Sequence, residues 1–390
     1  MNSRSAQRPG GELRVGFIID GNLPAPGEIF RKRMSPHRLF TGWPSASPMG
    51  RMRFNAIAQC LAARGSARYE LYRPFGRSYD AVIFLKSMNE ACLALAQRLQ
   101  AGGTAVIFDA NVDYYSSAPG DDYYAGMAPT ERQRAQAIAM TTLADGVMAS
   151  SRHLAAVCAQ YNARSQWVPD NVDNVPALLQ PPRYSEPLDL WWSGESVKLF
   201  ELLLIEEVLL KLRPRIHLHL VTNSLSALER WRGDFKARFL RLLEALPHTV
   251  HGFESVADLQ QKYSAGGLII SPRFLDHPYN LGHSEWKLTL GMACGLPALG
   301  SPVPSYLDVA ERAAPGAIRV CETLDDWEAG LRQCLAGDWP WAAARVAARR
   351  VVEEHYSTPV VSGMHLEFVR KCLADKDSTF SRSGDADGRM

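Results

Sequence analysis

The sequence has few cysteines, and their spacing gives no sign of a metal site or a disulfide framework. Its seven cysteines are scattered along the 390 residues, with no CxxC pair among them. Zinc sites and disulfide-rich domains depend on closely and regularly spaced cysteines. An odd number of dispersed thiols suits a reducing compartment, where each thiol is expected to be a small core residue. We therefore expect no bound metal.

Long apolar runs are also missing. The longest candidate, VKLFELLLIEEVLL, is interrupted by Glu201, Glu206 and Glu207, and no apolar core precedes Leu13. A membrane-spanning helix needs about 20 mostly apolar residues, and a secretory signal needs an apolar core of about 7 to 15. We therefore expect a soluble protein of the cytoplasm, and leave open a peripheral contact with the inner face of the membrane.

Neither sign of charge dominates, and three familiar motifs are absent. The 43 Lys and Arg residues nearly balance the 41 Asp and Glu residues, for a net charge of +2. Proteins that coat nucleic acid carry a basic excess, so we expect no nucleic-acid partner. The sequence lacks GxGxxG after a strand, GxxxxGK(S/T) and GxSxG. Their absence disfavours a dehydrogenase, a P-loop NTPase and an α/β-hydrolase.

What the sequence does contain is a regular alternation of short apolar runs and helical segments. Strand-like runs such as LRVGFIID and GTAVIFDA alternate with helices that end on glycine. A proline-rich connection follows, NVDNVPALLQPPRYSEP, and the alternation restarts at LDLWWSG. This rhythm is typical of parallel sheets covered by helices on both faces. We therefore predict an α/β protein with two Rossmann-like, doubly wound domains facing a cleft, where ligands meet the carboxyl ends of the strands.

The shifts in composition predict the domain boundaries. A chain of this length suits two domains. The polar ends are expected to be disordered. In order, the predicted segments are a tail at 1–10, a first domain at 11–177, a linker at 178–187, a second domain at 188–341, a terminal helical segment at 342–374 and a second tail at 375–390.

Three ordered motifs carry a resemblance to a known family. TLADGVMASSRHLAAV matches an ADxVxxxSxxL passage, WVPDNVD an xIPNGVD passage, and KLTLGMACGLPALGSPVPSYLDV a KxLExMAxGxPVxxSxxxxxxE passage. In this order they resemble the GT-B glycosyltransferases, particularly the retaining group that includes family 4. The resemblance spans roughly Gly11 to Leu373. It implies an acceptor domain, then a donor domain, then a helix that crosses back to the first domain. It also implies transfer of a sugar from a nucleotide-diphosphate sugar to a glycan, lipid-linked or other hydroxyl acceptor.

The expected donor site gathers positive charge at two helix starts. Lys198 follows the glycine turn at Gly194, and Lys287 lies near the start of the helix before MACG. A helix N-terminus offers free N–H groups and partial positive charge to a diphosphate, and a lysine adds a full charge. We predict that Lys198 and Lys287 stabilise the leaving group, without a metal or another cofactor. The alternative for each is a solvated lysine on a helix.

The resemblance implies further donor contacts, and the sequence departs from the family pattern at two positions. Contacts are expected from Phe253, His283, Ser284 and Glu285. The family pattern often carries two glutamates eight positions apart, of which the second accepts hydrogen bonds from the ribose. Leu290 and Gly282 stand at those positions. A leucine cannot accept a hydrogen bond, so the ribose contact must come from elsewhere or be lost.

The first domain is expected to hold the acceptor. Asp109 follows the apolar run AVIF and is our candidate for the catalytic base or an acceptor contact. Asp113, Arg51 and Arg53 are expected at the acceptor, the arginines as partners of an anionic group. Loop capping by Asp109 and solvated surface arginines are the alternatives. The long loop that ends at Gly50 is assigned to the acceptor as well.

Two other readings of the function stay open. One is a GT-B-like binding or scaffold protein that lost activity with the glutamates and supports a partner transferase. The other is a nucleotide-sugar epimerase. The base and sugar of the donor, the acceptor and the stereochemical outcome depend on a few contacts that motif spacing does not encode.

Overall fold

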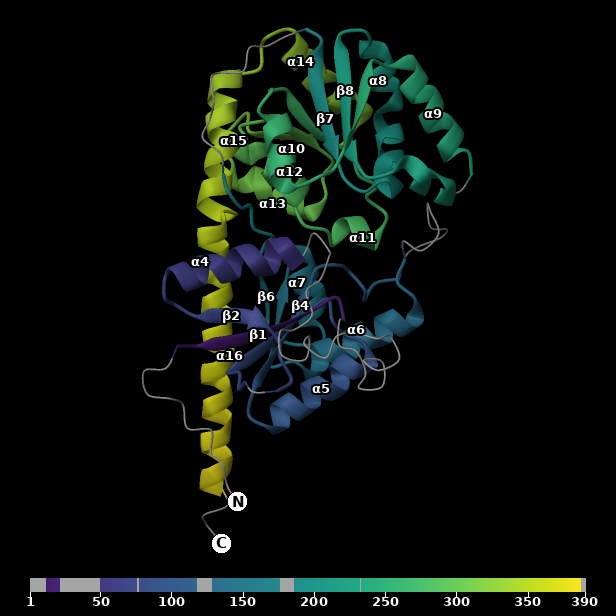
Figure 1. Ribbon diagram of the computed structural model, residues 1–390. Coiled ribbons are helices and arrows are strands. Elements are labelled where there is room, and N and C mark those ends of the chain that lie inside the picture. Colours follow the sequence, from purple (N-terminus) through teal and green to yellow (C-terminus); the bar gives the residue numbers. More distant parts are fainter. Residues whose placement is uncertain are drawn as a thin grey trace. The chain divides into compact units, whose positions relative to one another are not determined.

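The structure is a computed structural model that describes residues 12–21, 50–75, 77–117, 128–175, 186–231 and 233–386. The chain divides into two compact units (Figure 1). Unit 1 consists of Met1–Ser116, Pro129–Asn171 and Thr358–Met390, and unit 2 of Ser117–Ala128 and Val172–Ser357. The predicted tail at 1–10, most of the predicted linker and most of the long loop before Gly50 lie outside the described residues.

Unit 1 is built around a six-stranded sheet in the order β2-β1-β3-β4-β5-β6. Every neighbouring pair of strands is parallel. The strands are β1 (Arg14–Ile19), β2 (Arg68–Leu71), β3 (Ala81–Leu85), β4 (Ala105–Ala110), β5 (Gly146–Ala149) and β6 (Ser165–Trp167). The helices are η1 (Arg51–Ala56), α4 (Ile57–Ala63), α5 (Glu90–Ala101), α6 (Glu131–Leu143), α7 (Arg152–Ala159) and α16 (Thr358–Ala386).

The apolar runs of unit 1 serve both faces of its sheet. Side chains of a strand alternate between faces, so Phe17 belongs to one hydrophobic cluster and Ile18 to the other. Helices α4 and α16 contribute to the first cluster, and α5, α6 and α7 to the second. A parallel sheet buried on both faces needs continuous apolar strands, which is the pattern that the sequence shows.

Unit 2 repeats this plan with the strand order β12-β11-β10-β7-β8-β9. All of its neighbouring strands are parallel as well. The strands are β7 (Leu188–Ser193), β8 (Ile216–Thr222), β9 (His248–Gly252), β10 (Leu268–Ser271), β11 (Ala298–Gly300) and β12 (Ile318–Val320). The helices are η2 (Ser196–Ile205), α8 (Glu206–Leu212), η3 (Leu225–Arg230), α9 (Phe235–Ala245), α10 (Val256–Tyr263), α11 (Pro278–Leu281), α12 (Trp286–Ala293), α13 (Pro304–Arg312), α14 (Leu324–Leu335) and α15 (Trp341–His355). The prediction of two doubly wound α/β domains is confirmed, and the cleft between them stays a prediction.

The stretch VKLFELLLIEEVLL, expected to form one helix, is divided into two elements. A 3-10 helix, η2, ends at Ile205, and α8 begins at Glu206. A 3-10 run of ten residues is unusually long. Nearly all of η2 is buried, including the charged residues Lys198 and Glu201. Two ionisable side chains are therefore placed inside unit 2, where burial is costly unless they are paired.

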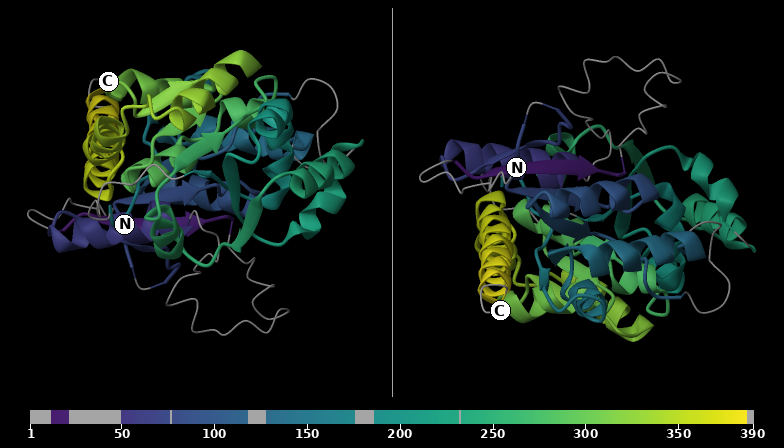
Figure 2. Two further views of the ribbon diagram at one scale, coloured as in Figure 1. Left: turned by 90° about the horizontal axis from the view of Figure 1, so that it is seen from above. Right: turned by 90° about the horizontal axis from the view of Figure 1, so that it is seen from below.

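The last helix returns the chain to unit 1 and is longer than the sequence predicted. Helix α15 belongs to unit 2, and α16 to unit 1, where α16 lies beside α4 in both views of Figure 2. The sequence predicts a disordered tail from 375 onward, but α16 continues to Ala386. Near this point Lys376 Nζ donates to the carbonyl oxygen of Thr104 at 2.7 Å and lies 3.3 Å from the carboxylate of Asp145. Extending a helix that is already formed costs little per residue.

Candidate functional site

Lys287 lies against the end of the first strand of unit 2. Its Nζ is 4.7 Å from the ring centroid of Trp192, the second-last residue of β7. This Nζ is buried and has no hydrogen-bond partner among the described residues, although the residue as a whole is only half-buried. A Cβ atom at Gly194 would lie 2.4 Å from the same Nζ. The glycine after β7 is therefore required for the close approach of the ammonium group.

Lys198 is held by an aromatic residue of the loop that follows β10. Its Nζ donates to Tyr279 Oη at 2.6 Å and lies 4.4 Å from the centroid of the Tyr279 ring. The ring of Tyr279 in turn stacks on His283, with centroids 5.2 Å apart. Lys198 is only 4% exposed. This is not the solvated lysine of the alternative interpretation.

A third cation, Arg273, joins these lysines from the carboxyl end of β10. Its side chain is 1% exposed. Nη1 donates to Glu201 at 3.2 Å and to Asn280 Oδ1 at 3.3 Å, and Nε donates to Tyr306 Oη at 3.3 Å. Nη2 is buried and has no hydrogen-bond partner among the described residues. We refer to Lys198, Arg273 and Lys287 as the cation cluster.

The cation cluster brings three basic groups together with two carboxylates, Glu195 and Glu201, that act on Lys287. Burial lowers the pKa of Lys287 well below its ordinary value, and repulsion by Arg273 and Lys198 lowers it further, whereas Glu201 and Glu195 raise it. Burial would also lower the pKa of Arg273, but the interactions with Glu201, Tyr306 and Tyr279 together outweigh it and raise the pKa. Arg273 and Lys198 are thus near enough to Lys287 to affect its pKa, and a shared donor site for the two lysines stays a prediction. An anion bound beside Lys287 would favour the charged form of its ammonium and would stabilise the site.

The segment directly before α12 contains three of the predicted donor contacts. Ser284 and Glu285 are buried, and Glu285 occupies the N-cap position of the eight-residue helix. His283 is half-buried. The helix packs tightly on the sheet, since a Cβ at Gly291 would come 2.4 Å from the side chain of Ile269. Leu290, on the same helix, is 1% exposed. The position expected to hold a ribose-binding carboxylate is thus part of the apolar interior.

Phe253 follows β9 at the same edge of the sheet. Its N–H donates to the carbonyl oxygen of Thr222 at 3.1 Å, which places it next to the end of β8. Its side chain is 38% exposed. An exposed aromatic ring at the carboxyl edge remains open to a flat ligand group.

In unit 1, the structure pairs two predicted acceptor residues with each other. Arg53 Nη2 donates to Asp109 Oδ1 at 2.8 Å and Nε to Oδ2 at 3.0 Å, while Nη1 donates to Asp170 Oδ1 at 2.8 Å. Arg53 and Asp109 have no exposed surface. Burial raises the pKa of Asp109, and its pairing with Arg53 opposes that shift. Arg53 is therefore not the solvated surface arginine of the alternative interpretation, and Asp109 is bound to Arg53 in a buried ion pair rather than open to an acceptor.

Asp113 caps a turn rather than facing an open site. Its Oδ1 accepts from the backbone N–H groups of Tyr115 at 2.9 Å and Ser116 at 3.0 Å. Arg51 begins η1, but its side chain lies outside what the structure describes. The two remaining acceptor predictions therefore receive no geometric support from unit 1.

Comparison with known proteins agrees with the architecture. No protein family and no curated protein matches the sequence. Among solved structures, the chain is similar to a sucrose-phosphate synthase from Thermosynechococcus elongatus, with a TM-score of 0.63, 14% identity and coverage of 94% of this chain and 100% of that one. It is also similar to HepE from Anabaena in complex with UDP and glucose, with a TM-score of 0.61, 12% identity and coverage of 92% and 100%. The match to TarM has a TM-score of 0.54 at 12% identity and covers 74% of this chain and 54% of that one.

The chain has the GT-B fold. Both units contribute to the match, because it covers nearly the whole chain in two of these cases. The chain spans about half the length of TarM. The prediction of the GT-B fold, made from three short motifs, is confirmed.

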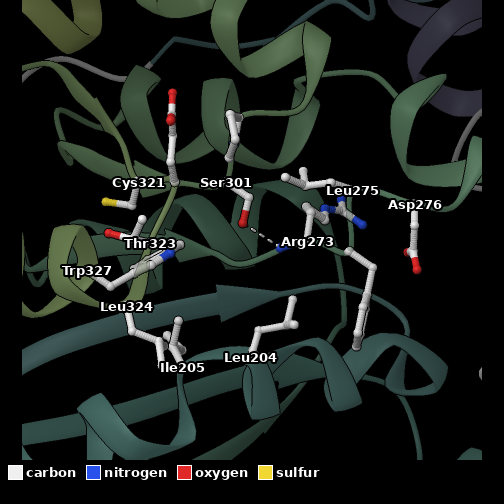
Figure 3. A pocket seen from close by; sticks show the side chains of 13 residues that line it. Leu204, Ile205, Arg273, Leu275, Asp276, Ser301, Cys321, Thr323, Leu324 and Trp327 are labelled. Carbon is white, nitrogen blue, oxygen red and sulfur yellow. Dashed lines mark hydrogen bonds between the residues drawn. The ribbon is translucent and has the colours of Figure 1, made fainter.

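Unit 2 of this GT-B chain also contains a cavity beside the cation cluster. It has a volume of about 350 Å³, and its lining includes residues that follow β10, β11 and β12. Figure 3 shows the side chains that line it. Leu204, Ile205 and Trp327 form apolar walls, and Arg273 takes part in the lining. The backbone N–H of Arg273 donates to Ser301 Oγ at 2.9 Å, the dashed line in Figure 3. The cavity and the cation cluster are therefore joined through one residue.

Two absences hold for the part of the chain that the structure describes. It contains no helix long and apolar enough to cross a membrane. It also contains no group of three or more His, Cys, Asp or Glu side chains that could hold a metal ion.

The sequence analysis missed the residues that organise the cluster. Arg273 had a usable signal, because a basic residue directly after the buried run GLIISP lies at the carboxyl edge of a sheet. Glu201 and Tyr279 had none. Glu201 reads as an interruption of an apolar helix, and Tyr279 as one more aromatic residue of a loop.

Proposed function

We propose that the protein is a glycosyltransferase of the hexosyltransferase type, which binds a nucleotide-diphosphate sugar in unit 2. The observation that carries this proposal is the buried cation cluster, and within it the ammonium of Lys287, which has no hydrogen-bond partner among the described residues. A diphosphate brings negative charge, together with oxygen atoms that accept hydrogen bonds. The UDP bound to HepE, a structure with the same fold, supports this ligand class.

The cluster suggests how the chain itself would assist the transfer. When the bond between the sugar and the diphosphate breaks, negative charge develops on the leaving phosphate. Lys198, Arg273 and Lys287 would stabilise that charge, which is often the largest catalytic contribution in such a transfer. Three cations make a metal ion unnecessary for this role. No cofactor beyond the donor substrate is part of the proposal.

The acceptor is proposed as the hydroxyl group of a glycan, a lipid-linked glycan or another molecule. Its proton needs a base, and the carboxylate of Asp109 is already bound to Arg53 at both oxygens. We propose that the leaving phosphate accepts this proton instead. Such a role of the leaving phosphate is expected of a retaining enzyme, which relies on that phosphate more than an inverting enzyme does.

The first test is thermal unfolding in the presence of UDP, GDP, ADP and CMP. One nucleotide should raise the midpoint, and Lys198→Ala and Lys287→Ala should each abolish the rise. Lys236→Ala is the matched control, because Lys236 is an exposed lysine paired with Glu229. Turnover of the corresponding nucleotide sugar with candidate acceptors then separates an enzyme from a binding protein. If none of the four nucleotides has an effect, the scaffold interpretation replaces this proposal.

A further inference from the structure

Tyr279 contacts Lys198 in two ways at once. The phenol oxygen accepts a hydrogen bond from Nζ at 2.6 Å, and the ammonium lies 4.4 Å from the ring centroid. A lysine ammonium has three N–H donors. The phenol occupies one of them, so two remain for a ligand, and the ring adds a cation–π attraction. The contact therefore fixes the position of the ammonium and leaves two of its N–H donors for a ligand.

The short helix that carries Tyr279 also contacts the second cation of the cluster. Asn280 Oδ1 accepts from Arg273 Nη1 at 3.3 Å, and Asn280 Nδ2 donates to the carbonyl oxygen of Phe274 at 3.0 Å. Arg273 Nη1 is bound in turn to Glu201, three positions after Lys198 in η2. Two adjacent residues of α11 thus connect cations that come from separate elements of unit 2.

We propose that Tyr279 is the positioning residue of the cation cluster and holds the ammonium of Lys198 where the diphosphate binds. This inference rests on the proposed function. A lysine side chain has a long flexible stem, and ordering it at the moment of binding lowers the affinity. Tyr279 orders the stem in advance. The hydroxyl group of Tyr279 then affects the ligand through Lys198, whereas its ring also stacks on His283.

A double-mutant cycle tests this dependence. The dissociation constant of UDP, or of the nucleoside diphosphate that binds best, is measured by calorimetry for wild type, Tyr279→Ala, Lys198→Ala and the double variant. We expect Tyr279→Ala to weaken binding about threefold to tenfold, the range for ordering one flexible side chain. In the Lys198→Ala background the same change should have a clearly smaller effect, limited to what the ring contributes through His283. Tyr161→Ala, at a half-buried tyrosine of unit 1 that stacks on Tyr115, is the control and should leave binding unchanged.

The conservative variant Tyr279→Phe separates positioning from packing. It removes the hydrogen bond and keeps the ring, so we expect a smaller loss of affinity that disappears without Lys198. Tyr279→Phe also replaces Tyr279→Ala in the double-mutant cycle if the alanine variant fails to fold. Equal losses with and without Lys198, or unchanged binding in both tyrosine variants, overturn the inference while leaving the proposed function intact. A wild-type protein that binds none of the four nucleotides overturns the proposed function, and this inference with it.

Discussion

Replacing Lys287 by methionine should make the empty protein more stable while removing its ligand response. Methionine keeps the unbranched stem and similar volume but has no ammonium to bury. An unsatisfied buried polar group costs about 1–3 kcal/mol, and more when it is charged. The cation–π attraction between the ammonium and the ring of Trp192 offsets about 0.5–2 kcal/mol of that cost. We therefore expect Lys287→Met to raise the free energy of unfolding by about 1 kcal/mol at neutral pH, or the midpoint by about 2–4 °C.

The pH dependence of this gain follows from the lowered pKa of Lys287. Between the pKa of the folded state and the ordinary value of 10.5, the unfolded chain binds more protons than the folded one, so the wild type becomes more stable as the pH rises. Above the ordinary value the side chain is neutral in both states. The advantage of Lys287→Met should therefore be largest at low pH and shrink as the pH approaches the ordinary value.

The assay is chemical denaturation of both proteins across this pH range, with and without UDP. Lys236→Met, at an exposed lysine, is the control and should show neither the gain nor the pH dependence. A Lys287→Met protein that is less stable than the wild type at neutral pH and still responds to UDP would refute the reasoning. That result would mean that the ammonium is satisfied in the folded protein and takes no part in binding the anion.

Two further predictions concern the surroundings of the cluster and the paired residues of unit 1. Gly194→Ala should lower stability by about 1–3 kcal/mol, because a residue with a Cβ rarely adopts its φ of +156° and the new Cβ would lie 3.1 Å from the ring of Trp192. Gly252→Ala, with nothing within 4 Å of the new Cβ, should not lower stability, and denaturant titration of both variants decides. Asp109→Asn should destabilise the protein by about 3–5 kcal/mol by leaving the charge of Arg53 only partly paired, yet leave the UDP dissociation constant unchanged. If Asp109→Asn instead changes the UDP dissociation constant and leaves stability unaltered, Asp109 takes part in ligand binding.

The sequence was sufficient to predict the architecture because the fold depends on local patterns. Apolar runs such as AVIFL (Ala81–Leu85) are buried on both faces of a parallel sheet, and their alternation with helices leaves few topologies. The division of VKLFELLLIEEVLL into η2 and α8 could not be predicted in this way. An apolar stretch buried on all sides has no face that fixes a helical period, so the choice between a 3-10 and an α-helix depends on its neighbours.

Residues of the candidate site could be predicted only where their position at the end of a strand or the start of a helix indicates which edge of the sheet they occupy. Lys198 and Lys287 follow strands or begin helices, and parallel strands bring such positions to one edge. The pairing of Arg53 with Asp109 joins residues 56 positions apart, and that of Arg273 with Glu201 joins residues 72 apart. Whether such a group is open to a ligand or bound to a partner is decided by tertiary contacts. Asp109 therefore looked like a base in the sequence and is a structural partner in the fold.

In the proposed donor site, the ligand would be recognised chiefly through its phosphates, because the expected ribose-binding acid is replaced by a leucine. Leu290 lies in the apolar interior and offers no hydrogen-bond acceptor to a ribose. The cation cluster, in contrast, carries one ammonium without a hydrogen-bond partner among the described residues and one guanidinium nitrogen in the same condition. Keeping such groups buried lowers the stability of the empty protein, and an anion would recover that loss on binding. The stability of the empty protein and its response to a nucleoside diphosphate are therefore expected to change in opposite directions when Lys287 is replaced by an apolar residue.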